Sequence, residues 1–212
     1  IGVILGTYPS DLARGGADAV AFSSVPGELG IPVLTLRSAD FGLLEATVMT
    51  WSGPYDAELT ATVKHSTARA WNVLGLVPGT GSEIIVVGGH YDHLGMGGAD
   101  SLAPGVQAVH NGADDNASGT AVVLELAEQR GARGAARGPR GILYACWAAE
   151  EMGLLGSQWW VKHTTVPLKN VVANVNLDMV GRIASGKVTV GSAETAAAFR
   201  PALDAVQAEL RA

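Results

Sequence analysis

Three short apolar runs, each followed at once by acidic or imidazole side chains, constrain the fold of this chain most strongly. The runs and the residues that follow them are 84–89 with His90, 142–149 with Glu150 and Glu151, and 171–177 with Asp178. Each run is short and rich in β-branched or aromatic residues, which is typical of a strand buried on both faces. The sequence therefore predicts three core strands, each ending in residues that can carry chemistry.

Two segments with apolar side chains at helical spacing lie between and after these strands. Residues 118–129 repeat Val122, Val123 and Leu126 on one expected face, and residues 154–163 form the second candidate helix. Strands that alternate with helices predict an α/β fold, in which a doubly wound, mostly parallel sheet has helices on both faces. Ligand sites in such sheets lie outside the carboxyl ends of the strands, so the residues after the runs are expected at one edge.

The composition supports a packed core and argues against several classes of function. Hydrophobic residues make up 48% of the 212 residues and charged residues only 16%, so a disordered chain is not expected. The net charge of −6 argues against a nucleic-acid partner. No apolar run reaches the length of about 18 residues that a membrane span needs. The single cysteine, Cys146, lies in the second run and is expected in the core.

A polar loop before the first candidate helix adds a further set of candidate ligands. Residues 111–119 (NGADDNASG) hold Asp114 and Asp115 beside Asn116. One acidic residue there could cap the helix, because the amides of a helix N-terminus are unpaired. Two successive aspartates and an asparagine exceed what a cap needs. We therefore expect this loop to contribute to the same site as the strand ends.

The expected site combines one imidazole with several carboxylates, a ligand set suited to Zn²⁺, with Mn²⁺ or Co²⁺ as substitutes. Collecting so much negative charge without a cation would be costly. Asp92 follows His90 by two residues and is expected to fix the imidazole tautomer through a hydrogen bond. Of the adjacent Glu150 and Glu151, one can bind metal while the other takes a proton from a metal-activated water.

Four ordered motifs resemble the di-zinc aminopeptidases, metallopeptidase family twenty-eight of clan MH, whose members include relatives of bacterial leucyl aminopeptidase and of glutamate carboxypeptidase. The motifs are residues 89–93 (GHYDH), 111–119 (NGADDNASG), 148–157 (AAEEMGLLGS) and 176–179 (NLDM). The resemblance covers residues 72–183. It implies a phosphorylase/hydrolase-like zinc peptidase fold that binds two Zn²⁺ ions per complete active site. The implied activity is hydrolysis of N-terminal residues from peptide substrates.

The resemblance also implies a role for each residue of the site. The metal ligands would be His90, Asp115, Glu151 and Asp178. Asp115 would bridge the two metals, with the 115–116 peptide bond in the cis form. Glu150 would be the general base that deprotonates the metal-activated water, and Asp92 would complete the catalytic set as the orienting partner of His90.

The second metal site of this family takes a histidine from well beyond the Asp178 motif, and residues 179–212 contain no histidine. We therefore expect the domain to be truncated at its C-terminus, and the chain by itself to bind metal poorly and to be inactive. His93 and His110 lie near the motifs but match no ligand position of the family. Structural or substrate-edge roles are expected for both.

The N-terminal residues 1–46 resemble part of a protease-associated domain, an insert found in this family. The resemblance lies in residues 16–22 (GADAVAF) and 30–36 (GIPVLTL). It predicts two units, a partial protease-associated domain over 1–46 and an incomplete zinc peptidase catalytic domain over 47–212. Resemblance alone also implies a secreted or periplasmic protein, with any signal peptide upstream of Ile1.

Two other functions stay open at this point. A one-zinc acyl transferase of the glutaminyl-cyclase type has the same fold, and neither Asp115 nor the Glu150–Glu151 pair excludes it. A non-catalytic interaction protein, similar to transferrin-receptor-like relatives, would have lost metal ligands. The retained ligand residues favour an enzyme.

Overall fold

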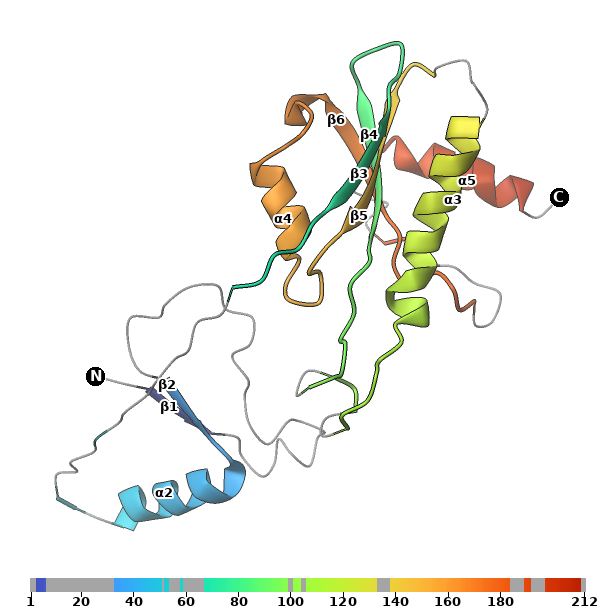
Figure 1. The fold of residues 1–212 in the computed structure, drawn as a ribbon. Coiled ribbons are helices and arrows are strands. Elements are labelled where there is room, and N and C mark those ends of the chain that lie inside the picture. Colours follow the sequence, from blue (N-terminus) through green and yellow to red (C-terminus); the bar gives the residue numbers. More distant parts are fainter. Residues whose placement is uncertain are drawn as a thin grey trace.

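The main part of the protein is a four-stranded sheet with helices packed against it (Figure 1). This computed structural model describes residues 3–6, 33–50, 52–53, 58, 67–98, 101–103, 106–132, 138–183, 189–191 and 197–210. The strands are β3 (Val73–Val77), β4 (Ile84–His90), β5 (Gly141–Trp147) and β6 (Val171–Asn176), in the spatial order β3-β5-β4-β6. The three strands expected from the apolar runs are present, and β4 and β5 are buried as predicted. β6 instead lies at an edge of the sheet with most of its residues exposed, so the prediction of a third buried strand is wrong.

The sheet is mixed. β4 pairs in parallel with both β5 and β6, whereas the edge strand β3 pairs antiparallel with β5. The carboxyl ends of β4, β5 and β6 therefore meet at one edge of the sheet, as the sequence predicts. The α/β class is confirmed.

Helices on both faces bury the central strands. The helices of this part are α3 (Gly119–Ala132), α4 (Leu155–Lys162), α5 (Phe199–Glu209) and a short 3₁₀ turn over Leu168–Asn170. Figure 1 shows α3 and α4 on opposite sides of the sheet. α3 begins one residue after the predicted start, and α4 falls within its predicted range.

Side chains of β5 alternate between two hydrophobic clusters, because successive residues of a strand point to opposite faces. Leu143, Ala145 and Trp147 belong to the cluster that contains Trp160 of α4. The rings of Trp147 and Trp160 lie 5.5 Å apart between centroids. The intervening residues of β5 pack with α3, which fixes the central strand from both sides.

The α3 side of the core differs from its predicted face. Val123 is buried and packs with Tyr144 and Cys146, so the core position expected for the cysteine is confirmed. Val122 and Leu126 are exposed instead of sharing this face. The predicted apolar face of α3 was wider than the observed one. Only the row of side chains that contains Val123 and Ala127 packs against the sheet.

The N-terminal residues form a separate small sheet. β1 (Val3–Gly6) pairs in parallel with β2 (Val33–Leu36), and α2 (Ser38–Thr50) follows. The domain boundary predicted after residue 46 falls within α2, and residues 16–22, on which part of the domain prediction rests, lie outside the described residues. In the described part of the chain, no helix has both the length and the apolar character that crossing a bilayer requires.

Candidate metal centre

The candidate site lies at the carboxyl edge of the three parallel strands. His90 is the last residue of β4, Glu150 and Glu151 occupy the turn after β5, and Asp178 follows the end of β6. Asp115 reaches the same place from the irregular turn Ala113–Ser118 that leads into α3. The structure therefore brings together all the ligand candidates that the sequence predicts.

His90 lies at the centre of this group, and only 2% of its surface is exposed. Its Nε2 atom is 3.1 Å from Oδ1 of Asp115 and 3.6 Å from Oδ1 of Asp178. The Oε2 atom of Glu150 is 3.8 Å from the same nitrogen. Three carboxylates thus converge on one ring nitrogen.

Asp92 supports this arrangement through two different groups of atoms. Its backbone carbonyl oxygen lies 3.1 Å from Nδ1 of His90, closer than its carboxylate, which is 3.8 Å away. A proton on Nδ1 can be donated to this carbonyl, which leaves the lone pair of Nε2 facing the carboxylates. The Asp92 carboxylate itself accepts hydrogen bonds from the backbone N–H groups of Glu150 (3.0 Å) and Glu151 (3.2 Å). It therefore holds the turn that carries both glutamates.

Backbone geometry directs the side chains that leave β5 and β6. Ala149, directly before Glu150, has φ 53°, and Met179, directly after Asp178, has φ 50°. Residues other than glycine adopt such left-handed conformations at a cost, and they concentrate at functional sites. The two sharp turns thus occur next to the carboxylates of the candidate site.

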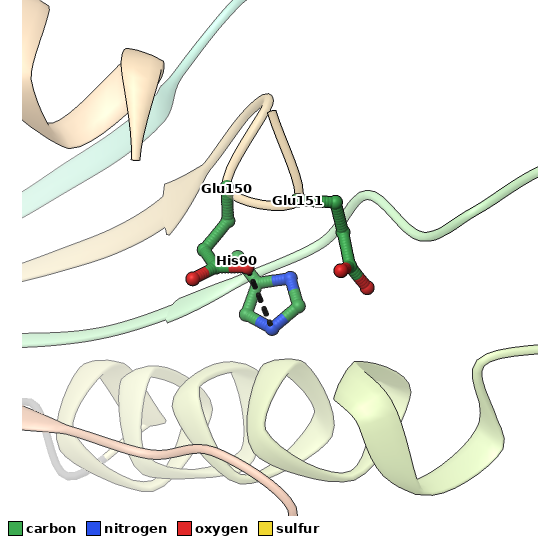
Figure 2. A group of neighbouring side chains, drawn as sticks. All are labelled: His90, Glu150 and Glu151. Carbon is green, nitrogen blue, oxygen red and sulfur yellow. Dashed lines mark ion pairs between the residues drawn. The ribbon is translucent and has the colours of Figure 1, made fainter. Parts of the chain in front are cut away.

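Glu150 and Glu151 leave the same turn and descend on either side of the His90 ring in Figure 2. Glu150 and His90 line a hollow of about 400 Å³, whereas Glu151 and His93 line a second one of about 410 Å³. Burial raises the pKa of the Glu150 carboxyl; the charge of His90 lowers it, and the nearby carboxylates raise it further. A carboxyl group with a raised pKa is better suited to accept and return a proton.

Glu151 makes a contact that the sequence did not predict. Its Oε1 atom lies 2.7 Å from Nδ1 of His93, and both side chains are about four-fifths buried, with 20% and 21% exposed. His93 lies three residues beyond His90 on the segment that leaves β4. The only sequence signal for this contact was the spacing of two histidines three residues apart, His90 and His93.

The turn that carries Asp115 is fixed by its neighbour Asn116, of which only 1% is exposed. Asn116 donates to the Leu177 carbonyl (2.9 Å), and its Oδ1 accepts from the N–H groups of Gly119 (3.0 Å) and Met179 (3.2 Å). The cis 115–116 peptide bond that the resemblance implied is present. Asn116 therefore ties the turn before α3 to the end of β6.

Gly119 permits the close approach of these two segments. A Cβ atom at this position would lie 2.3 Å from the Leu177 carbonyl oxygen and 2.5 Å from Oδ1 of Asn116. The start of α3 could not lie this close to the end of β6 with any larger residue. The asparagine and the glycine together set the distance between Asp115 and Asp178.

Asp114 supports the loop and is in none of the candidate metal groups of the described residues. Its carboxylate accepts hydrogen bonds from the N–H of Gly181 (2.8 Å) and from Nε of Arg182 (2.6 Å). The hydrogen bond from Arg182 is the main cause that lowers the pKa of this carboxyl. Asp114 thus ties its turn to the segment after Asp178.

Asn72 is a further positioning residue, and sequence reasoning missed it. It donates to the Gly156 carbonyl (2.8 Å) and accepts from the N–H of Ala148 (3.1 Å). It thereby joins β3 to both ends of the turn that carries Glu150 and Glu151. A lone asparagine before an edge strand gives no such signal, because its partners lie 76 and 84 residues away.

We expect Asn116→Ala to lower the free energy of unfolding by about 2–3 kcal/mol, because it leaves buried partners without hydrogen bonds. Asn174→Ala, at an exposed position of β6, is the control and should change it by less than about 0.5 kcal/mol. Urea unfolding of the metal-free protein measures both. If both variants changed the free energy of unfolding by the same small amount, Asn116 would not hold the turn.

Three groups of side chains in the described residues could hold a metal ion, each with its ligand atoms within 4.8 Å of one another. They are His90, Asp115 and Asp178; His93, Asp115 and Glu151; and His90, Glu150 and Glu151. Each has one imidazole and two carboxylates, a donor set that suits Zn²⁺. A ring nitrogen facing several carboxylate oxygens is stable when a cation lies between them. The residues present therefore fit a metal.

Comparison with known proteins agrees with this chemistry. The family model for Peptidase family M28 matches residues 72–211, a range that begins directly before β3 and includes every candidate ligand. The chain is 31% identical to the "Probable lipoprotein aminopeptidase LpqL" of Mycobacterium tuberculosis, over 77% of this chain and 30% of that protein.

Fungal proteins show similar levels of identity. A "Probable leucine aminopeptidase" of Arthroderma benhamiae is 30% identical over 78% of this chain and 44% of its own length. A "Probable glutamate carboxypeptidase" of the same fungus is 31% identical over 68% of this chain and 18% of its own length. The chain thus spans less than half of each of these relatives.

Proposed function

This chain belongs to peptidase family M28, and from that premise we propose that the complete protein is a metal-dependent exopeptidase that removes N-terminal residues from peptides. The observation that carries the proposal is the position of Asp115, which takes part in two different candidate metal groups. A carboxylate shared in this way could serve two metal ions. The word aminopeptidase in the names of two of the relatives described above supports the N-terminal specificity.

The proposed ligands are those expected from the sequence. His90 and Asp178 would hold one Zn²⁺ and Glu151 would contribute to holding a second, with Asp115 available to both sets. When bound, the metal pair supplies a Lewis acid that polarises the scissile carbonyl and acidifies a water molecule. Burial of His90 and the support of Asp92 preorganise the first ligand set before any metal enters.

Glu150 is the proposed general base. Its carboxylate lies on the His90 side of the turn, lines a hollow, and has a raised pKa. It takes a proton from the attacking water as the new C–O bond forms, and it returns that proton to the amine as the C–N bond breaks. Asp92 holds the backbone of Glu150 in place throughout.

The domain arrangement is proposed on the same premise. Residues 47–212 belong to a zinc peptidase domain whose complete sheet is doubly wound, and residues 1–46 to part of a protease-associated domain. The M. tuberculosis relative is named a lipoprotein, which supports a location in the cell envelope or outside the cell. Peptides are the proposed partners.

Metal removal tests the proposed function in the complete protein. We expect a chelator to abolish release of p-nitroaniline from leucyl-p-nitroanilide, and Zn²⁺ to restore it, because the carbonyl is not polarised without the metal. N-acetyl-leucyl-p-nitroanilide is the matched control and should not be cleaved. Elemental analysis confirms that the metal has left.

Three results would contradict the proposal. Full activity in protein shown to be metal-free would exclude a metal mechanism. Release of residues from the C-terminus of blocked peptides would indicate a carboxypeptidase. One tightly bound zinc, with release of ammonia from N-terminal glutamine and no peptide hydrolysis, would favour the glutaminyl-cyclase type of acyl transferase.

A further inference from the structure

We propose that His93 is a positioning residue: its ring holds the carboxylate of Glu151, and this contact makes Glu151, and not its neighbour Glu150, the metal ligand of the turn after β5. This inference rests on the proposed function, because it concerns how one of the proposed ligands is oriented. It goes beyond that function by giving a task to a side chain outside the proposed ligand set. His93 keeps the structural role that the sequence predicts and binds no metal itself.

The contact between His93 and Glu151 joins two segments that lie far apart in the chain. Nδ1 of the ring is 2.7 Å from Oε1 of the carboxylate, although the two residues are 58 positions apart. A carboxylate accepts hydrogen bonds and donates none, so the ring carries a proton on Nδ1 and donates it. The hydrogen bond occupies one carboxylate oxygen of Glu151 and leaves the other oxygen for a cation.

The two adjacent glutamates differ in how their side chains are held. Within the described residues, the His93 ring is the only group that donates a hydrogen bond to the Glu151 carboxylate, and the Glu150 carboxylate receives none. The Oε2 atom of Glu150 lies 3.8 Å from Nε2 of His90, which is too far for a hydrogen bond. A fixed carboxylate suits a metal ligand, whereas an unbonded one suits a group that takes and returns a proton.

The surroundings of the His93–Glu151 pair separate it from the proposed base. Both side chains are about four-fifths buried, so water competes little with their hydrogen bond. They line the hollow of about 410 Å³, whereas Glu150 and His90 line the other one. His93 therefore keeps Glu151 at a different hollow from that of Glu150, although both glutamates leave the same turn.

The His93 ring is itself fixed by the backbone of a second turn. Gly112 has φ 61°, and a Cβ atom there would lie 2.8 Å from Cγ and 2.9 Å from Cβ of His93. The imidazole therefore packs directly on the turn that carries Asp115 three residues later. One side chain thus contacts both turns from which the shared metal set draws its carboxylates, and it can hold Glu151 in place before a metal enters.

Metal titration of the complete protein tests this role, with Zn²⁺ added to the metal-free form and binding followed by calorimetry and native mass spectrometry. Wild type is expected to bind two equivalents. His93→Ala should weaken one of them by about 10–100-fold, the usual cost of losing the partner of a ligand, and leave the other unchanged. His110→Ala is the matched control, because this neighbouring histidine makes no contact with Glu151, and both equivalents should bind as in wild type.

Two amide variants distinguish a hydrogen-bond donor from a residue that only fills space. The side-chain nitrogen of asparagine is bonded to Cγ, as Nδ1 of histidine is, so His93→Asn keeps a donor at the place that faces Glu151. In His93→Gln the nitrogen is one bond further out, near the place of Nε2. The asparagine variant should restore the affinity close to the wild-type value, and the glutamine variant should leave it weakened.

NMR of the histidine rings gives a reading that does not depend on affinity. Two-bond ¹H–¹⁵N correlations of the complete protein report which ring nitrogen carries the proton. We expect the His93 ring to be protonated on Nδ1 both in the metal-free protein and after loading with Zn²⁺. A ring that binds metal through either nitrogen would give a different pattern in the loaded protein.

The outcomes separate this role from the proposed function. A wild-type protein that binds no metal would overturn both together. Unchanged affinity for both equivalents in His93→Ala would overturn the role of His93 alone. A His93 ring bound to metal in the loaded protein, or equal affinities of the asparagine and glutamine variants, would also overturn it. Should His93→Ala fail to fold, the two amide variants and the NMR measurement still decide.

Discussion

Replacing Glu150 by Gln in the complete protein is expected to lower kcat on the order of 10²–10⁴-fold while the metal content stays unchanged. Glutamine has nearly the same shape but cannot accept a proton, so the variant removes proton transfer and little else. The backbone N–H of Glu150 that binds Asp92 is unaffected by the change. Steady-state kinetics with leucyl-p-nitroanilide and elemental analysis measure the two quantities.

Glu151→Gln is the matched control, since it makes the same chemical change one residue later in the same turn. It should weaken metal binding, because Glu151 belongs to the group with Asp115 and His93. We therefore expect Glu150→Gln to keep its metal and lose turnover. Glu151→Gln should lose metal affinity. Near-normal peptidase activity of Glu150→Gln, or the reverse pattern of metal loss, would overturn the assignment of the base.

β4 and β5 were predictable because their apolar runs are buried on both faces. β4 and β5 are covered along most of their length, so nearly every residue is apolar and the period of two that marks a half-exposed strand is not required. The direction of β3 was not predictable. Its residues are partly exposed at an edge of the sheet, where parallel and antiparallel pairing leave the same sequence pattern.

The helix α2 could not be predicted from the sequence, for a different reason. Ser38–Thr50 is helical, but its apolar residues are not gathered on one face, and none of those described is buried. Hydrophobic periodicity therefore gives no indication of this helix.

The residues of the site were predictable as a set, but their partners were not. These residues lie at or just after the carboxyl ends of strands, and a parallel sheet brings those ends to one edge. They are His90, Glu150, Glu151 and Asp178. The hydrogen bonds of Asn72 and Asn116 join segments that meet only in the folded protein. The left-handed backbone of Ala149 is likewise set by the folded turn. Asparagine side chains are common in loops, so the sequence alone cannot distinguish a structural hydrogen bond from a solvated one.

We expect Asp115→Asn to weaken both metal equivalents by more than about 100-fold and to reduce activity to background, because a single carboxylate serves both ligand sets. The change keeps the shape of the side chain but removes the charge that two cations share. Without metal, the protein should be as stable as wild type or more stable, since one of several crowded carboxylates loses its charge.

Linkage between binding and folding gives this prediction a second measurement that is independent of turnover. Free Zn²⁺ at 100 times its dissociation constant stabilises a wild-type site by about 2.7 kcal/mol, and a site weakened 100-fold gains only about 0.4 kcal/mol at the same concentration. Wild type should therefore show a clear rise in Tm on adding Zn²⁺, and Asp115→Asn almost none. Asp114→Asn is the matched control: its side-chain oxygen can still accept from Gly181, and it should keep the rise. If both variants lost the rise equally, the loop would act through its fold and not through a shared ligand at Asp115.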